Sequence, residues 1–213
     1  MPLDGKTDTC MLISNRTTVQ MSDSLTPHSP SSLYRDLNKR IDAAMSLHLW
    51  PSEKTTLQRG RYNTTYPPCN QTPSINQTSS FTNFSPIFIH IEVKRPNTDK
   101  DPLVQLGAWT AAEFTKRVLE EYSLDMPVCA IDVSGDEWNI YLVYARIIDA
   151  RAKGSFTTQF VGPIKMGDTM SLRGCFALLT FLAGVADWGL GAYRQWFERE
   201  ILDLYRPKNH AGE

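Results

Sequence analysis

One segment constrains the fold more than any other: residues 87–94, Ile-Phe-Ile-His-Ile-Glu-Val-Lys, which follow a proline. The run is rich in β-branched residues and almost continuously apolar, which is typical of a strand buried on both faces. A strand of that kind lies inside a sheet that has helices on both sides. The segment therefore predicts an interior strand of an α/β domain.

The sequence after this strand predicts the rest of such a domain. A helix is expected from Pro102 to about Tyr122, because Asp101 can cap it and its apolar residues recur at helical spacing. The later predicted elements are a hairpin of strands at residues 127–131 and 138–144, a strand at 157–161, and helices at 171–188 and 193–205 separated by Gly-Leu-Gly.

The sequence before this strand is harder to assign. Residues 33–47 carry apolar residues at helical spacing and predict a helix. Residues 48–86 are rich in Asn, Thr, Gln, Ser and Pro, and predict a long loop with one short strand or none. Residues 1–32 and 207–213 are expected to be disordered tails, so that one domain spans residues 33–206.

Composition limits the function. The chain has 22 Lys and Arg against 23 Asp and Glu, so no overall field attracts it to a polyanion and any nucleic-acid site must be local. Its four cysteines lack zinc-site spacing and are expected to be free thiols in a reducing compartment. No signal peptide is apparent, and the apolar stretch 175–185 is shorter than the roughly 20 residues of a spanning helix. We expect a soluble protein of the nucleus or cytoplasm without a membrane partner, whose oligomeric state the sequence leaves open.

Two charged side chains stand at the end of the predicted interior strand. Glu92 and Lys94 project to the same face because alternate residues of a strand do, whereas Val93 faces the opposite packing layer. Buried charges need a partner, and either a mutual ion pair or a bound metal satisfies them. In a metal-dependent nuclease Glu92 would bind Mg²⁺, and Lys94 would position the attacking water and stabilise the charge that develops on phosphorus.

The spacing Asp/Glu-x-Lys is weak evidence by itself, since about one such pattern is expected by chance at this composition. A second one occurs at residues 4–6, in the predicted tail. The surroundings of Glu92 and Lys94 distinguish them, because a helix follows on which Gln105 and Trp109 lie one turn apart on the same face. The Gln105 amide can therefore point back at the end of the strand.

A strand that ends in Glu-x-Lys, followed by a Gln-Leu-x-x-Trp helix, resembles the RecB-like members of the PD-(D/E)XK superfamily. The chain is more closely similar to the fungal PD-(D/E)XK nuclease-like family over about residues 70–205, in the segments 74–78, 85–87, 91–94, 105–109 and 167–169 and at Trp138. The resemblance implies a restriction-endonuclease-like α/β fold, a small mixed β-sheet flanked by helices. It also implies that Glu92, Lys94 and Gln105 hold catalytic positions, that Glu92 and Val93 bind Mg²⁺, and that the substrate is DNA or RNA.

One expected residue is not apparent. Members with an intact site carry an Asp on a strand upstream of the Glu-x-Lys strand, and no acid occurs between Lys54 and Ile91. Glu53 is the nearest preceding acid, in a segment without strand character, so the upstream ligand is expected to be Glu53 or absent. Mg²⁺ held by one carboxylate would bind weakly.

The sequence therefore leaves three interpretations. The first is a metal-dependent nuclease, and the second is an inactive or repurposed fold that acts as a binding module or in a small-molecule biosynthetic pathway. The third is an error in the gene model, in which residues 48–70 replace the strand that would carry the Asp.

Other candidate residues have simpler explanations. His90 shares the face of Glu92, yet a lone histidine is more often a core residue than a metal ligand. The tryptophans sit within apolar patterns and are expected to pack in the core rather than stack on bases. Basic residues near Lys94, such as Arg95 and Lys100, either line a phosphate-binding rim or are simply solvated.

Overall fold

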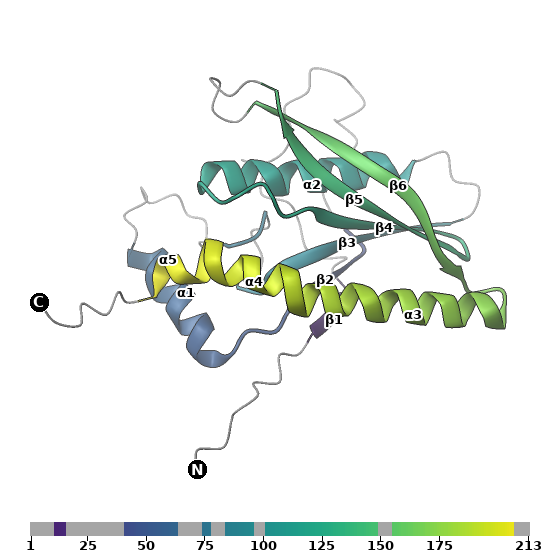
Figure 1. Ribbon diagram of the computed structural model, residues 1–213, viewed down its shortest axis with the longest axis horizontal. Helices are drawn as coiled ribbons and strands as arrows, with labels where there is room; N and C mark the ends of the chain where they lie inside the picture. Colours follow the sequence, from purple (N-terminus) through teal and green to yellow (C-terminus); the bar gives the residue numbers. More distant parts are fainter. Residues whose placement is uncertain are drawn as a thin grey trace, which may run out of the picture.

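A six-stranded sheet in the order β1-β2-β3-β4-β5-β6 forms the centre of the molecule (Figure 1). The computed structural model describes residues 11–15, 41–63, 74–77, 84–95, 101–148 and 155–206. The strands are β1 (Met11–Asn15), β2 (Ala43–Leu47), β3 (Ile87–Lys94), β4 (Val128–Ser134), β5 (Glu137–Ile147) and β6 (Phe156–Asp168). Only β3 and β4 pair in parallel, and every other neighbouring pair is antiparallel.

Helices cover both faces of this sheet. On one face, α2 (Pro102–Leu119) packs Leu106 and Trp109 against Ala130 of β4. On the other face, the C-terminal helical region packs Trp196 against Ile131. The predicted α/β fold, a mixed sheet flanked by helices, is confirmed and is consistent with a restriction-endonuclease-like fold.

The elements from β3 onward largely match the sequence prediction. The first six residues of β3 are buried, as expected for an interior strand. The α2 helix begins after Asp101, whose carboxylate accepts a hydrogen bond from the backbone N–H of Leu103 at 2.8 Å. The predicted hairpin is formed by β4 and β5, and β6 is longer than the predicted strand at residues 157–161.

The predicted helix at residues 33–47 is wrong where the structure describes it, because residues 43–47 form β2. Four of the five β2 residues are buried, so the strand shows no alternation of polar and apolar residues. A short apolar run of this kind cannot be assigned to helix or strand from its periodicity. Residues 33–40 lie outside the described ranges.

The predicted loop at residues 48–86 contains a helix, α1 (Pro51–Asn63). Pro51 occupies its first position, and the Glu53 carboxylate accepts a hydrogen bond from the backbone N–H of Trp50 at 2.8 Å. Among the helix residues whose burial is described, only Leu57 is buried. A helix with so small an apolar face gives no periodic signal in the sequence.

The predicted N-terminal tail contains the edge strand β1, which pairs with β2 over five residues. Its sequence, Met-Leu-Ile-Ser-Asn, is a short apolar run inside polar surroundings, and pairing with β2 satisfies the backbone groups that face that strand. The other predicted tail residues, including residues 207–213, lie outside the described ranges.

The two predicted C-terminal helices form one continuous helical region. It consists of α3 (Leu172–Trp188), η3 (Gly189–Tyr193), α4 (Arg194–Phe197), η4 (Glu198–Leu202) and α5 (Asp203–Tyr205), in which η3 and η4 are π-helical. Gly189 does not end the helix: it allows close packing, because a Cβ at this position would collide with the ring of Phe88.

This helical region of 34 residues, Leu172–Tyr205, is long and apolar enough to cross a membrane by length and composition alone. The expectation of an apolar stretch limited to residues 175–185 is therefore wrong. The second half of the region lies in the protein core, where Trp196, Phe197, Ile201 and Leu202 are buried.

Candidate active site at the end of strand β3

Glu92 and Lys94 project together from the end of β3. The Lys94 ammonium forms an ion pair with Oε1 of Glu92, whose side chain is only 1% exposed. Lys94 is half-buried, with 20% of its side chain exposed. The structure thus brings together the two charged residues that the sequence pattern places on one face.

The second oxygen of the Glu92 carboxylate is buried and has no hydrogen-bond partner in the described part of the chain. Burial raises the pKa of Glu92 to about 7; the hydrogen bond from Lys94 opposes this effect, and the charges of Asp42 and Asp132 add to it. An ionised Glu92 therefore lacks part of the solvation it needs. A cation beside Oε2 would supply it.

Asp42 is a further acid near Glu92 that the sequence pattern did not indicate. It immediately precedes β2, and its neighbour Ala43 pairs with Ile91 of β3. Oδ2 of Asp42 accepts a hydrogen bond from the backbone N–H of Val93 at 2.8 Å. An acid from the strand upstream of β3 therefore lies close enough to Glu92 to raise its pKa.

Glu53, the acid proposed from the sequence, lies elsewhere. It belongs to α1, caps the start of that helix and forms an ion pair with Arg194 in the C-terminal helical region. It is not among the groups that shift the pKa of Glu92. The interpretation that residues 48–70 replace an Asp-bearing strand stays a prediction, since residues 64–70 lie outside the described ranges.

A third acid, Asp132, lies on β4 directly beside Glu92 in the parallel pairing. Burial raises its pKa, while hydrogen bonds from Ser134 and Asn139 work in the opposite direction. Ser134 Oγ donates to Oδ1 of Asp132 at 2.9 Å. The carboxyl ends of parallel strands are where α/β proteins commonly place their sites, and Asp132 stands at that edge with Glu92.

Gln105 and Val93 complete the set of predicted site residues. Gln105 is buried in the first turn of α2, and that helix packs on β3 and β4. The charge of Asp101, the N-cap of α2, contributes to the raised pKa of Asp132, so the start of this helix lies within electrostatic reach of that acid. The side chain of Val93 is 48% exposed rather than packed in the opposite layer, so only its backbone is placed to serve the site.

The donor types at this edge fit a hard divalent cation. Within the described ranges, no group of three or more His, Cys, Asp or Glu side chains is arranged to hold a metal ion. Mg²⁺ nevertheless commonly binds through one or two carboxylates together with substrate phosphates. Asp42 and Glu92, one of them with an unpaired buried oxygen, are two such carboxylates.

His90 belongs to a different network, although it lies on the face of Glu92. It is fully buried, and its Nε2 lies 2.7 Å from Oε2 of Glu113 and 3.2 Å from Nε2 of Gln77. Burial alone would raise the pKa of Glu113, but Arg117 and His90 outweigh it and hold that pKa below its usual range. This geometry supports a core role for His90.

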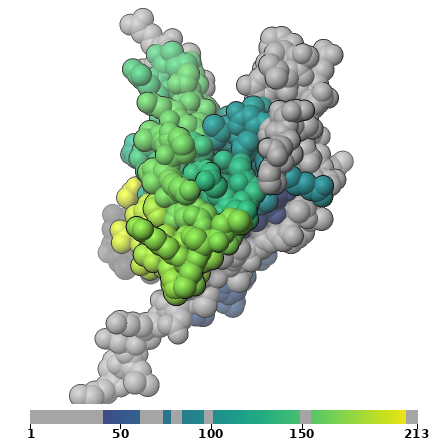
Figure 2. All heavy atoms as spheres, turned by 90° about the vertical axis from the view of Figure 1, so that its right-hand side faces the viewer, coloured from purple at the N-terminus to yellow at the C-terminus, as the bar shows by residue number. Residues whose placement is uncertain are grey.

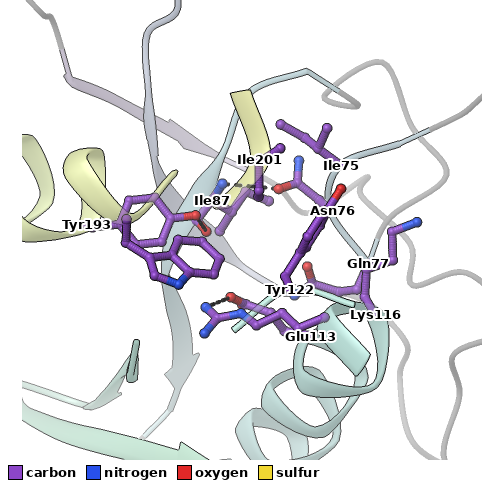
Figure 3. A pocket seen from close by; sticks show the side chains of 11 residues that line it. Ile75, Asn76, Gln77, Ile87, Glu113, Lys116, Tyr122, Tyr193 and Ile201 are labelled. Carbon is purple, nitrogen blue, oxygen red and sulfur yellow. Dashed lines mark hydrogen bonds and ion pairs between the residues drawn. The ribbon is translucent and has the colours of Figure 1, made fainter. Parts of the chain in front are cut away.

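This network joins three parts of the fold around a small cavity (Figure 3). Arg117 pairs with Glu113 on α2 and stacks over the ring of Trp196, 4.4 Å from its centroid. In Figure 3, Tyr193 approaches from the C-terminal helical region and Asn76 from the segment 74–77. The cavity is small, and packing and ion pairs hold the side chains that line it, as in a structural core.

Some of the segments that carry the family resemblance have structural roles. The Asn76 amide donates to the carbonyl of Ser85 at 3.0 Å and accepts from the backbone N–H of Ile87 at 3.1 Å, which fixes the start of β3. Asp168 accepts hydrogen bonds from both the N–H and the hydroxyl of Ser171 at the start of α3. The buried Trp109 and Trp196 pack in the two core clusters, as the sequence predicts.

Comparison with known proteins agrees with this geometry. The model of the PD-(D/E)XK nuclease superfamily matches residues 4–194, which include β1, Asp42 and the whole sheet. No curated protein and no solved structure matches the chain significantly. Since the match covers most of the sequence, this chain belongs to the PD-(D/E)XK nuclease superfamily.

Proposed function

We propose that the protein is a Mg²⁺-dependent nuclease that hydrolyses phosphodiester bonds of DNA or RNA, with its site at the ends of β2 and β3. The observation that supports this proposal most is the position of Asp42. Its carboxylate binds the backbone N–H of Val93, the residue after Glu92, and its charge raises the pKa of Glu92, whose second oxygen is buried and unpaired in the described part of the chain. We assign Asp42 as the upstream acid, in place of Glu53.

Each residue of the site would have a separate role. Asp42 and Glu92 would hold Mg²⁺, with the backbone of Val93 as a further candidate ligand. Mg²⁺ supplies charge stabilisation at a phosphate oxygen and lowers the pKa of an attacking water. Lys94 holds its ammonium beside Glu92, where it would stabilise the negative charge that develops on the phosphate.

Gln105 is proposed to position Lys94 or the attacking water from the start of α2. The same residue supports the finer assignment to the RecB-like branch, which remains a proposal. The nearly neutral chain offers no overall attraction to nucleic acid, so substrate affinity would depend on the few local cations and on the metal.

The test is a cleavage assay with the full chain, Mg²⁺ or Mn²⁺, and single- and double-stranded DNA and RNA. We expect cleavage that is lost in Asp42→Ala, Glu92→Ala and Lys94→Ala. Glu137→Ala is the matched control, because Glu137 is an exposed acid whose partner is the exposed Lys165. Cleavage that survives in Asp42→Ala, or wild-type protein that cuts none of these substrates, would refute the proposal.

A second candidate is a superfamily member that binds nucleic acid or a small molecule without cleaving it. The ion pair between Lys94 and Glu92 favours this candidate, because it satisfies part of the Glu92 charge without a metal. Calorimetric titration with Mg²⁺ separates the two functions. The nuclease is expected to bind the ion in a way that depends on Asp42, whereas the binding module is expected to show no such dependence.

A further inference from the structure

The first half of α3 presents an apolar surface that the described part of the protein leaves uncovered. Leu172, Phe176 and Leu179 are 76%, 62% and 61% exposed, and only Gly174, Leu178 and Val185 of this helix are buried. In Figure 2, which looks along α3 from the side where the helix begins, yellow-green atoms of this helix lie at the surface. Contiguous apolar surface of this kind commonly marks an interaction site.

The exposed residues follow a regular spacing. Arg173, Phe176, Thr180, Ala183 and Asp187 recur at alternating intervals of three and four residues, and all five are exposed. This spacing keeps them on one side of the helix, with Phe176 and Ala183 as its apolar members, a charged residue at each end and Thr180 in the middle. The exposed Leu172 and Leu179 lie beside this row. One side of α3 is therefore free, within the described part of the chain, to contact another helix.

The charges of α3 identify the partner. Arg173 and Asp187 are the only charged residues of this helix, and they lie seven residues before and seven residues after Thr180. If two copies pack antiparallel about a two-fold axis at Thr180, each Arg173 faces the Asp187 of the other copy. A parallel pair would instead bring like charges together.

The sizes of the side chains are also self-complementary. The same two-fold axis places Phe176 opposite Gly184, since each lies four residues from Thr180. The exposed Phe176 ring needs room, and no atom lies within 4 Å of the position that a Cβ of Gly184 would occupy. Because the axis is two-fold, the interface contains this pairing of a large Phe176 with a small Gly184 two times.

We propose that two copies of this chain associate through α3 as an antiparallel pair centred on Thr180. A lipid surface is the rival occupant, since the helical region Leu172–Tyr205 is apolar enough for a membrane. The two charges on the exposed face, and the burial of the second half of the region in the core, favour a protein partner. This inference does not depend on the nuclease proposal.

Sedimentation of the full chain tests it through a charge exchange. We expect a wild-type dimer whose Kd rises roughly tenfold or more in Arg173→Asp and in Asp187→Arg, because each change turns two attractive contacts into repulsive ones. The double variant Arg173→Asp/Asp187→Arg is expected to recover wild-type affinity within about threefold. Arg199→Asp, an exposed charge reversal on η4, is the control and should leave the dimer unchanged.

Three results would overturn the proposal. The first is a wild-type monomer at tens of micromolar, whether or not it binds phosphatidylcholine and phosphatidylserine vesicles. The second is a dimer that neither single reversal weakens. The third is a double variant no tighter than its parents, which would exclude the antiparallel arrangement.

Discussion

The carboxylate of Asp42 accepts a hydrogen bond from the backbone N–H of Val93 at 2.8 Å, across 51 residues of sequence. This contact joins β2 to the strand that carries Glu92 and Lys94. It holds the Asp42 carboxylate beside the site and satisfies a backbone donor near the end of β3. One hydrogen bond thus contributes both to the sheet and to the proposed metal site.

The role of Asp42 can be separated from its structural contact. Asp42→Asn keeps an oxygen that accepts from Val93 but loses the charge, so we expect the free energy of unfolding without metal to change by less than about 0.5 kcal/mol. Affinity for Mg²⁺ should fall at least tenfold, since even mutation of groups that only orient a metal ligand typically costs about 10–100-fold. Calorimetric titration and urea unfolding measure the two quantities. Unchanged Mg²⁺ affinity would remove Asp42 from the site.

The raised pKa of Glu92 predicts how stability depends on pH. The pKa is about 7 in the folded protein and near 4.5 in the unfolded chain, so between these values the folded protein binds a proton that the unfolded chain releases. The stabilising contribution of protonated Glu92 is therefore present at low pH and is lost as pH rises through about 7.

Glu92→Gln removes this dependence. At pH 8 the variant should be more stable than the wild type by on the order of 2 kcal/mol, whereas at pH 5 the two should differ little. Urea unfolding at both pH values, without divalent metal, provides the measurement. An equal difference at pH 5 and pH 8 would show that ionisation of Glu92 is not the cause.

The buried pair of Glu113 and Arg117 is expected to matter for stability rather than for catalysis. Glu113→Gln leaves the Arg117 charge without its carboxylate partner, which should lower the free energy of unfolding by about 3 kcal/mol. Glu137→Gln, in the exposed pair with Lys165, should cost less than about 1 kcal/mol. Similar losses in the two variants, measured by urea unfolding, would contradict this assignment.

Two helical glycines should respond in opposite directions to the same substitution. Gly189→Ala places a methyl group against the ring of Phe88 and should destabilise the protein by about 1–3 kcal/mol. Gly107→Ala in α2 meets no atom within 4 Å and should stabilise it by about 0.5–1 kcal/mol, because alanine favours a helix. Thermal unfolding of both variants tests whether Gly189 is required for close packing.

The sequence predicts those parts of the fold whose local patterns are strong. β3 and α2 follow from a continuous apolar run and from a cap with a proline after it, and the structure has both. β2 is short and almost wholly buried, so its sequence does not distinguish a strand from a helix. α1 has almost no apolar face. The only sequence feature that indicates its start is a proline at the first helical position, Pro51, with an acid in the first turn, Glu53.

The candidate site was predictable only in part for the same reason. Glu92 and Lys94 lie on one strand, so their shared face follows from the two-residue period. Asp42 and Asp132 join them through strand pairing, which is set by long-range contacts that a single sequence does not reveal. An acid directly before the apolar run of residues 43–47 was the available signal for Asp42, and the helix assignment of that run concealed it.

The sequential order of β2 and β3 has a consequence for how this family can diverge. The two acids are positioned by the antiparallel pairing of their strands and not by the chain that connects them. The entropy of closing such a connection grows only with the logarithm of its length, by about 0.6 kcal/mol for each doubling. Relatives could therefore lengthen or shorten the segment between these strands at small cost in stability. The number of residues between the two acids would then vary among relatives, while the distance between their carboxylates stayed the same.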